Sequence, residues 1–436
     1  MTAFDLSLLP ASATVDAAGR VAIAGVDVAA LAERFGTPLY VYDEADIRLR
    51  CRAYRAAFGD GAAYASKAFL CVAMARLAHE EGMHLDVATG GELHVALAAG
   101  FPAERIVFHG NNKSTAELHA AIEAGVGRIA VDSADELDRL EQLVAEGLTG
   151  PRVHVRVTPG VEAHTHEFIE TGTEDSKFGF GLDSGEALAA VRRVVEGGRL
   201  QFAGVHCHIG SQVFRLDSFQ RAIQKMVGLV RAIEVEVGAN VDELNLGGGL
   251  GVRYEADDAP PTIEEYATLV RESVGKALAD AGVRSRPNLL TEPGRSIVAV
   301  AGLTLYTVGT IKKIEGVRTY VAVDGGMSDN LRPVTYGARY EAFLPARATA
   351  ERSARVTVAG KHCEQGDVVV RDARVPRDLA IGEILATPVT GAYGHSLASN
   401  YNKVTRPAVV FLRDGEARVV VRRETQSDLV RLDVES

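Results

Sequence analysis

Short apolar segments recur through the first two thirds of the chain and alternate with longer stretches of mixed polarity. Eight such segments cover residues 62–68, 84–89, 106–110, 128–133, 153–158, 202–209, 243–249 and 288–292. Each is short and largely apolar, which is typical of strands buried on both faces of a parallel sheet. The pattern therefore predicts eight parallel β-strands.

The stretches between these segments carry the signals of helix ends. Four begin with a hydroxyl residue followed three positions later by glutamate, a spacing in which the hydroxyl caps the helix and the glutamate reaches back. The pairs are Thr89 and Glu92, Ser114 and Glu117, Ser133 and Glu136, and Thr262 and Glu265. Glycines that suit C-terminal caps follow three helical runs, at Gly100, Gly125 and Gly282.

Eight strand–helix units within roughly 230 residues fit a closed (β/α)8 barrel of the TIM type. An open, doubly wound sheet is the alternative, and it expects a GxGxxG motif after its first strand. The sequence Tyr64-Ala-Ser-Lys67-Ala does not supply that motif, which favours the barrel.

Both flanks of the predicted barrel carry further β-strand patterns. Residues 21–25 and 38–43 are predicted to be strands, and 28–35 a helix. After Arg295 the β-rich segments are 297–311, 319–324, 355–359, 367–370, 383–387, 408–412 and 417–422. We therefore predict a barrel domain over residues 37–292. A second, all-β domain, a β-barrel or sandwich, is predicted from residues 1–36 and 293–436.

Composition narrows the class of protein. The chain has 436 residues, of which 47% are hydrophobic and 24% charged, as in ordinary globular proteins. Its net charge of −11, without a basic block, argues against a nucleic-acid partner. The four cysteines lack a CxxC spacing, so neither a zinc site nor a disulfide framework is predicted. We find no signal peptide and no run of about 18 apolar residues, and expect a cytoplasmic location without a membrane span.

Polar residues gather at the carboxyl ends of the predicted strands, which is the end of a barrel where catalytic residues lie. The first strand ends at Lys67, the second at Asp86, the sixth at His208 and the eighth at Glu292. The seventh ends in Gly247-Gly-Gly-Leu-Gly251. If the barrel is correct, all of these residues face one mouth.

Each of these residues has a chemical and a structural interpretation. The apolar neighbours of Lys67 would desolvate its amine and make it a nucleophile toward a carbonyl, although a rim lysine is the simpler interpretation. The run Gly247–Gly249 offers backbone N–H groups to phosphate oxygens, or only a tight turn. A buried Glu292 needs a positive partner, which is either Arg295 or a protonated ring nitrogen.

Two histidine pairs raise the question of a metal. His206 and His208 share one face of a strand, and His164 and His166 lie in a predicted loop. No carboxylate or third histidine is identified that would complete either site, so no metal is predicted. An imidazole that stacks on an aromatic cofactor is the better role for His208. An amine lysine, a phosphate nest, a flat stacking residue and a carboxylate together indicate a pyridoxal 5′-phosphate site.

Several motifs resemble those of the barrel-type, pyridoxal-phosphate-dependent basic amino acid decarboxylases, and within them the branch that acts on diaminopimelate. The resemblance covers residues 38–402. It rests on Tyr64-Ala-Ser-Lys67, Asp175-Ser-Lys-Phe-Gly-Phe180, His208-Ile-Gly-Ser211, Gly247-Gly-Gly249, Glu292-Pro-Gly-Arg295, Asp329-Asn-Leu-Arg332-Pro with Tyr336, His362-Cys363-Glu364 and Gly391-Ala-Tyr393.

The resemblance implies a role for each matching residue. Lys67 would bind the cofactor covalently, and Cys363 would give a proton to the α-carbon of the substrate. The other residues implied to bind the cofactor are Asp86, His208, Ser211, Gly248, Gly249, Glu292, Gly294, Arg295 and Tyr393. Those implied to bind the substrate are Arg295, Arg332, Tyr336, Glu364 and Tyr393.

The implied reaction is the decarboxylation of meso-2,6-diaminopimelate to L-lysine and carbon dioxide, the last step of lysine biosynthesis. Arg332 suits the distal carboxylate of that substrate, which ornithine and lysine lack. The resemblance also implies a homodimer, because Cys363 and Glu364 would reach the active site of the neighbouring subunit.

The chain departs from the family pattern at four positions, namely Phe69, Leu331, His362 and Gln365. None removes a catalytic group, but they leave open a paralogue that acts on a related carboxylated or basic amino acid in secondary metabolism. An amino acid racemase would place arginine at the ring nitrogen, against Glu292. A non-catalytic relative would be expected to lose Lys67 or Cys363, and both are present.

Overall fold

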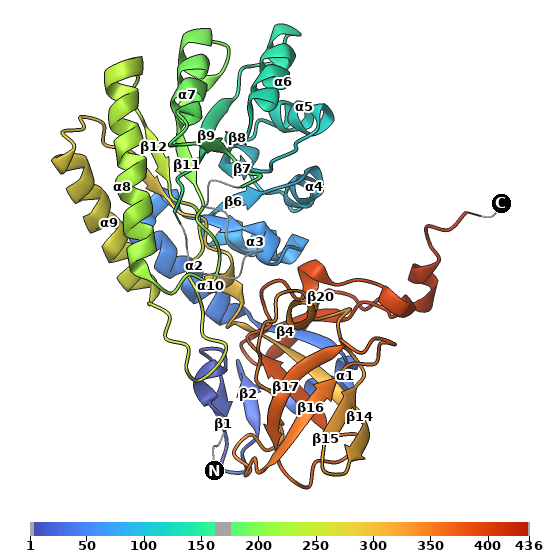
Figure 1. Cartoon of the computed structure of the whole chain (residues 1–436). Helices are drawn as coiled ribbons and strands as arrows, with labels where there is room; N and C mark the ends of the chain where they lie inside the picture. Colours follow the sequence, from blue (N-terminus) through green and yellow to red (C-terminus); the bar gives the residue numbers. More distant parts are fainter. Residues whose placement is uncertain (1–3, 162–175, 435–436) are drawn as a thin grey trace. The chain divides into compact units, whose positions relative to one another are not determined.

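The computed structural model describes residues 4–161 and 176–434. It divides into two compact units, each described here by itself (Figure 1). The barrel unit comprises Cys51–Gly251 and Pro260–Arg295. The β unit comprises Met1–Arg50, Val252–Ala259 and Ser296–Ser436.

The barrel unit contains all eight predicted parallel strands. They are β5 (Ala63–Ala65), β6 (His84–Val87), β7 (Ile106–Phe108), β8 (Arg128–Val131), β9 (Arg152–Thr158), β11 (Gln201–Cys207), β12 (Glu243–Asn245) and β13 (Asn288–Leu290), paired in that order. The short strand β10 (Phe180–Gly181) also pairs with β9. A parallel bridge between Ala62 and Thr291 joins the first strand to the last, so the predicted (β/α)8 barrel is confirmed.

Helices follow most of the strands and lie outside them (Figure 1). They are α3 (Val72–Glu80), α4 (Gly90–Ala98), α5 (Thr115–Ala124), α6 (Ala134–Ala145), α7 (Glu186–Gly197), α8 (Leu216–Ala232) and α9 (Ile263–Asp280). Helix α8 buries Phe219, Ile223, Met226 and Val230, a helical spacing that turns one apolar face to the strands. Among the described residues, no helix is both long and apolar enough to cross a membrane.

The predicted helix caps are confirmed. Thr89, Ser114, Ser133 and Thr262 each accept a hydrogen bond from the backbone N–H of the glutamate three residues later. The reciprocal bond forms at Ser114 and Thr262. Glu92 and Glu136 instead accept from the backbone one residue before the cap. The three predicted capping glycines, Gly100, Gly125 and Gly282, have positive φ angles of 77°, 75° and 61°.

A buried ionic cluster fills the amino end of the barrel, opposite to the strand ends that carry the predicted site. Glu243, at the start of β12, accepts two hydrogen bonds from Arg128 (2.7 and 2.5 Å) and one from Arg152 (3.1 Å). His154 donates the fourth, at 2.6 Å. Burial raises the pKa of Glu243, but the bonds from Arg128 and His154 outweigh it and hold that pKa well below its usual value.

The β unit is built on one mixed sheet. Its order is β17 (Val368–Val375), β16 (Ala354–Ala359), β15 (Arg318–Val323), β14 (Gly302–Ile314), β4 (Leu39–Asp43), β19 (Ala408–Arg413) and β20 (Glu416–Val421), and β18 (Ile384–Pro388) also pairs with β14. A three-stranded sheet precedes it, made of β1 (Thr14–Val15), β2 (Val21–Ile23) and β3 (Val26–Asp27). The helices are α1 (Val28–Phe35), α10 (Arg295–Val298) and α11 (Arg332–Thr335).

Three predicted assignments differ from the structure. The predicted barrel domain began at residue 37, but β4 pairs with β14 and β19, and all five of its residues are buried in the sheet of the β unit. The predicted strand over 297–311 begins only at Gly302, because residues 295–298 form the short helix α10, which buries Ile297 and Val298. The segment Val252–Ala259 also falls in the β unit rather than in the barrel.

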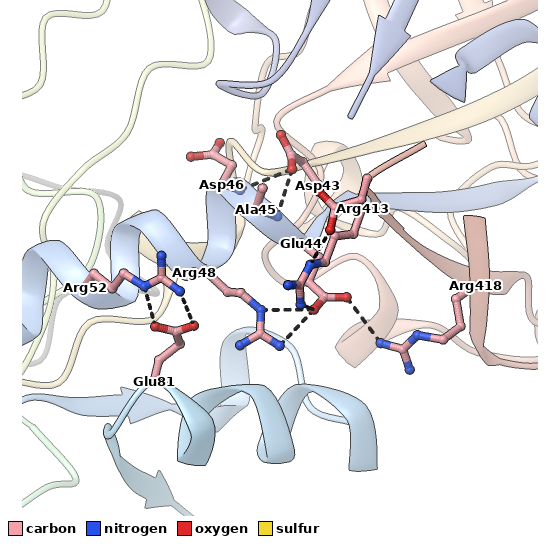
Figure 2. A network of polar contacts seen from close by, with 10 residues as sticks. Asp43, Glu44, Ala45, Asp46, Arg48, Arg52, Glu81, Arg413 and Arg418 are labelled. Atoms are coloured by element: carbon pink, nitrogen blue, oxygen red, sulfur yellow. Dashed lines mark hydrogen bonds and ion pairs between the residues drawn. The ribbon is translucent and has the colours of Figure 1, made fainter. Parts of the chain in front are cut away.

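Helix α2 (Glu44–Phe58) begins directly after β4 and is held there by charge (Figure 2). Asp43 caps it by accepting from the backbone N–H groups of Ala45 (3.0 Å) and Asp46 (3.1 Å). The buried Glu44 binds Arg48 at 2.8 Å and the arginines of β19 and β20, Arg413 at 3.3 Å and Arg418 at 3.2 Å. One carboxylate thus ties the start of the helix to two strands of the sheet.

We predict that Glu243→Gln destabilises the protein at pH 7. The change leaves the partly buried Arg128 without its counter-ion and weakens the acceptor of the buried His154, at a cost of up to about 3–5 kcal/mol, the range for a broken buried pair. Because the pKa of Glu243 is depressed in the folded state, its contribution is present above the unfolded value of about 4.3 and is lost as the pH falls. The deficit in thermal unfolding midpoint should therefore shrink between pH 7 and pH 3.5.

The matched control is Asp280→Asn, which removes one partner of an exposed pair with Lys276 on α9. Exposed pairs contribute little, so its midpoint should stay close to that of the unmodified protein. Equal midpoints for both variants would contradict a stabilising role of the Glu243 cluster.

Candidate active site

The predicted residues of the barrel unit lie at the carboxyl ends of its strands. Lys67 follows β5, Asp86 is in β6, His208 follows β11 and Glu292 follows β13. Parallel strands of a barrel all end at the same face, so the fold brings these residues to one mouth. Both Lys67 and Glu292 act electrostatically on Asp86 and on His208.

Of the two interpretations of Lys67, the structure fits the simpler one. The side chain of Lys67 is exposed, as expected for a lysine at the rim of a barrel, and its apolar neighbours do not desolvate it. It lies in a 3-10 turn, Ser66–Ala68, in which Ser66 and Ala68 are buried and the middle residue points away from them. The apolar neighbours in the sequence therefore pack into the barrel without covering the lysine.

Glu292 is buried and bound by three donors from three other strands. Its Oε1 atom accepts from His109 Nε2 at 2.8 Å and from Asn245 Nδ2 at 2.6 Å, and its Oε2 atom accepts from His206 Nε2 at 3.1 Å. Of the two partners that the sequence suggested, Arg295 instead donates to Ser211 Oγ, at 3.2 and 2.8 Å. The positive partner of Glu292 inside the protein is a histidine.

The charges of this cluster follow from burial and pairing. Burial raises the pKa of Glu292, but His109 and His206 outweigh it, so that pKa lies well below its usual value. Burial lowers the pKa of His109, but Glu292 and Asp86 outweigh it and raise that pKa. Burial alone dominates at His206, whose pKa falls to about 3. The pairing therefore favours the ionised form of Glu292 and the protonated form of His109, whereas burial favours the neutral form of His206.

Asp86 is the second carboxylate of the cluster. Its Oδ1 atom lies 3.9 Å from His109 Nε2, and burial raises its pKa to about 6. Burial also keeps the pKa of His208 well below its usual value, so that imidazole is neutral. A neutral, flat ring suits stacking on an aromatic cofactor.

The glycine run after β12 leaves no room for side chains. A Cβ atom on Gly248 would lie 2.1 Å from the carbonyl oxygen of Glu292, and one on Gly249 would lie 2.3 Å from that of Gly210. Two of the three N–H groups are already bonded, Gly247 to Asn245 Oδ1 at 2.9 Å and Gly248 to His208 Nδ1 at 3.3 Å. Fewer backbone N–H groups of this run are thus available to a phosphate than predicted, and the one that remains is that of Gly249.

The turn after β13 is packed as tightly as the glycine run. A Cβ atom on Gly294 would lie 3.0 Å from the side chains of Ala65 and Ala68, next to Lys67. Arg295 is buried and donates to Ser211, so the turn after β13 meets the loop after β11, which carries another predicted cofactor-binding residue. The glycine cradles, the neutral ring of His208 and the carboxylate of Glu292 fit a pyridine ring that carries a phosphate.

The remaining predicted residues belong to the β unit. Arg332 is buried, and its Nη1 atom donates to the hydroxyls of Tyr254 (3.0 Å) and Tyr340 (2.5 Å). Within the described part of the chain, no carboxylate lies at ion-pair distance from Arg332. Tyr336 is partly exposed, and so is Tyr393, whose positive φ of 63° marks a constrained backbone.

Cys363 and Glu364 are exposed on a loop of the β unit. Asn402 accepts from the backbone N–H of Cys363 at 3.2 Å, and Tyr401 donates to Glu364 Oε1 at 2.5 Å. His362, one of the four departures from the family pattern, is buried and bonds Ser328 at 2.8 Å. These contacts hold the loop in place while its two functional side chains remain accessible.

Three predicted residues cannot be placed, and two residues of the site were missed. Asp175, His164 and His166 lie outside the described residues. Sequence reasoning missed His109 and Asn245, although both stand in predicted strands, over 106–110 and 243–249. It also paired His206 with His208, whereas the structure places His206 with His109 and Glu292, three residues whose ligand atoms lie within 4.8 Å of one another.

Comparison with known proteins agrees with this geometry. A family model described as "Pyridoxal-dependent decarboxylase, pyridoxal binding domain" matches residues 44–299. The diaminopimelate decarboxylase of Mycobacterium tuberculosis (strain ATCC 25618 / H37Rv) is 49% identical over 435 residues, which cover 98% of this chain and 97% of that protein. The enzyme of the same name from Bacillus subtilis (strain 168) is also 49% identical and covers 95% of each chain.

Solved structures give the same answer. The diaminopimelate decarboxylase of M. jannaschii in complex with L-lysine is 35% identical, with a TM-score of 0.90 and 98% of each chain covered. That of Helicobacter pylori with L-lysine is 31% identical, with a TM-score of 0.85, and covers 93% of this chain and 98% of that one. The chain therefore belongs to the family of pyridoxal-dependent decarboxylases.

Proposed function

We propose that this protein decarboxylates meso-2,6-diaminopimelate to L-lysine and carbon dioxide, the last step of lysine biosynthesis. Its cofactor is pyridoxal 5′-phosphate, as predicted and as its family requires. Relatives at 49% identity over nearly the full length carry this activity in their names. L-Lysine, the product of the proposed reaction, is bound in two of the similar structures.

The observation that carries the choice of substrate is the buried guanidinium of Arg332. A buried charge is costly unless it is paired, and the described partners of Arg332 are two neutral phenols. A substrate with a second carboxylate supplies the missing counter-ion in bidentate form. Lysine, ornithine and arginine have no such group at the distal end, so they would leave Arg332 unpaired. Tyr336 and Glu364 are proposed to contact the same distal end.

The proposed cofactor site uses the residues predicted from the sequence. Lys67 would bind the cofactor covalently, and His208 would stack on its ring. The residues that would hold the phosphate are Ser211, Gly248, Gly249, Gly294, Arg295 and Tyr393. The glycine run supports this assignment, because a Cβ atom at Gly248 or Gly249 would collide with the carbonyl oxygen of Glu292 or Gly210, so only glycine lets the backbone of this loop lie where it does. Asp86 and Glu292 supply the negative charge on the ring side of the site.

The proposed chemistry divides between the cofactor and the chain. The bound cofactor takes up the electron pair that the departing carboxyl group leaves on the α-carbon. Glu292 accepts a hydrogen bond from the ring nitrogen and so keeps that nitrogen protonated. Cys363 Sγ then gives a proton to the α-carbon, which its exposed position allows. A racemase would need a weaker electron sink, and the ionised Glu292 disfavours that alternative.

We further propose a homodimer in which each subunit completes the active site of the other. The exposure of Cys363 and Glu364 supports it. A thiol that donates a proton and a carboxylate that binds an ammonium group are expected to lie in a shielded site, and both side chains are exposed in the single chain. A substrate bound to the cofactor in the barrel unit would then receive its proton from a residue of the partner subunit. The cytoplasmic location and the lack of a nucleic-acid partner stay predictions.

Carbon dioxide release tests the substrate. The purified holoenzyme should act on meso-diaminopimelate far better than on lysine, ornithine or arginine. Arg332→Lys keeps the charge but loses bidentate binding, so kcat/KM for diaminopimelate should fall about 100-fold. The matched control is Arg339→Lys, at an exposed arginine that pairs with Glu255, and its kcat/KM should be unchanged. No release from diaminopimelate would refute the proposal and favour a paralogue with another carboxylated substrate.

Cofactor affinity tests the glycine cradle. Gly248→Ala forces its Cβ against the carbonyl oxygen of Glu292, so the affinity for pyridoxal 5′-phosphate should drop at least about tenfold. Dialysis and absorbance titration measure it. Gly275→Ala on α9 has no atom within 4 Å of its Cβ and should keep full affinity, with a gain of about 1 kcal/mol in helix stability. Equal affinities would show that the glycine run is only a turn.

Mixing two inactive variants tests the shared site. Lys67→Ala and Cys363→Ala should each lack activity alone. If the two groups come from different subunits, a heterodimer holds one intact site, and an equal mixture should regain about a quarter of the activity. The measurement is carbon dioxide release after the subunits are exchanged. A mixture as inactive as its components would place both groups in one subunit.

A further inference from the structure

We propose that His109 is a positioning residue for the ring nitrogen of the cofactor. Through its hydrogen bond to Glu292 it keeps that carboxylate ionised and oriented, so that one lone pair stays available to the ring N–H. The inference rests on the proposed role of Glu292 and adds a residue that the family motifs in the sequence did not include. Four observations support it.

The first observation is the number of donors on Glu292. An ionised carboxylate has about four lone-pair sites and donates nothing, so each histidine nitrogen that contacts it must be an N–H. His109 and Asn245 occupy Oε1, and His206 occupies one position on Oε2. One acceptor position on Oε2 is left, although the residue is buried. A buried carboxylate that is short of one donor is a site for one further N–H.

The second observation is a contrast within the same barrel. Glu243, at the opposite end, is also a buried carboxylate bound by a histidine, but its four positions are all filled by Arg128, Arg152 and His154. The chain can thus saturate a buried carboxylate when its role is structural. At Glu292 it stops at three donors.

The third observation is the balance of charge. His109 is the one cation that touches Glu292, and Asp86 adds a second carboxylate 3.9 Å from the same imidazole. His206 is neutral, and its buried Nδ1 atom has no partner among the described residues. Arg156 is offset by Asp132 at 3.5 Å. Within the described part of the chain, Lys67 acts electrostatically on Asp86 but makes no hydrogen bond to Glu292. Glu292 therefore has one partner whose protonated form it favours, His109, and a protonated ring nitrogen would be the second.

The fourth observation is how the carboxylate is aimed. Asn245 donates to Glu292 Oε1 and accepts from the backbone N–H of Gly247 at 2.9 Å, so it ties the carboxylate to the glycine run. With His109 on the same oxygen, both bonds turn Oε1 toward the protein. Oε2 is then the oxygen that remains for the ligand.

Loss of the His109 charge has a specific consequence. In His109→Gln the amide N–H still reaches Oε1, but two carboxylates remain without a cation between them. The charges of Glu292 and Asp86 act on one another, and two like charges without a cation favour the uptake of one proton. A protonated Glu292 no longer attracts the ring N–H, so the variant loses its preference for a ring nitrogen while the contacts to the rest of the cofactor persist.

The experiment compares two ligands and needs no amino acid substrate. Binding of pyridoxal 5′-phosphate is measured against its analogue in which ring C–H replaces the nitrogen. The unmodified protein should prefer the natural cofactor about 10- to 100-fold, as expected for a charged hydrogen bond. His109→Gln should reduce this preference to about threefold or less. His206→Gln, at the neutral histidine, should retain most of it, and His119→Gln, at an exposed histidine on α5, all of it.

The outcomes separate the possible roles. An equal loss of affinity for both ligands in His109→Gln would reduce His109 to a structural residue and overturn the proposal. The proposal also fails if the unmodified protein shows no preference, a measurement that does not depend on how any variant folds. Stoichiometric zinc in the purified protein would show that His109, His206 and Glu292 bind a metal instead. Because binding alone is measured, the result stands even if diaminopimelate proves not to be the substrate.

Discussion

A buried carboxylate imposes the central constraint on this protein, because Glu292 must find its donors inside the barrel. No single strand can supply them. His109 comes from the end of β7, His206 from β11 and Asn245 from β12, and each reaches Glu292 only because the strands are parallel and the barrel closes between β13 and β5. The strand pairing that closes the barrel therefore also assembles the candidate site. An error in strand order would leave the carboxylate without its partners, at the cost of an unpaired buried charge.

The two ends of the barrel solve the same problem in different ways. At the amino end, the arginines and histidine around Glu243 occupy all of its acceptor positions, so this cluster is a saturated set of ion pairs and hydrogen bonds. At the carboxyl end, the donors are imidazoles and an amide, which are weaker and fewer. A guanidinium beside Glu292 would satisfy it fully and would exclude a cationic ring. With histidine in place of arginine, Glu292 would keep one acceptor position for the ring nitrogen, as the proposed function requires.

The sequence predicted the barrel well because its signals are local. Apolar runs, capping hydroxyls and glycines are each read within a few residues, and the strands and caps were found at the expected places. Pairing between distant segments is not local. The run 38–43 looks like a barrel strand, yet it lies between β14 and β19, and nothing within the run itself distinguishes the two partners. The same limit made Arg295, three residues away, an obvious partner for Glu292, while His109 is 183 positions distant.

His109 could nevertheless have been found from the sequence, because the rule that located Asp86 and His208 applies to every strand end. It stands directly after β7, as Asn245 closes β12. The sequence left the exposure of Lys67 open, since it depends on a single turn of 3-10 helix that buries Ser66 and Ala68. A division of labour follows from these placements. The barrel residues would serve any amino acid attached to the cofactor, because they would contact only the ring and the phosphate of the cofactor. In the proposed function, discrimination between amino acids would fall to Arg332, because its buried charge has only neutral hydroxyl partners among the described residues and a distal carboxylate would supply the counter-ion.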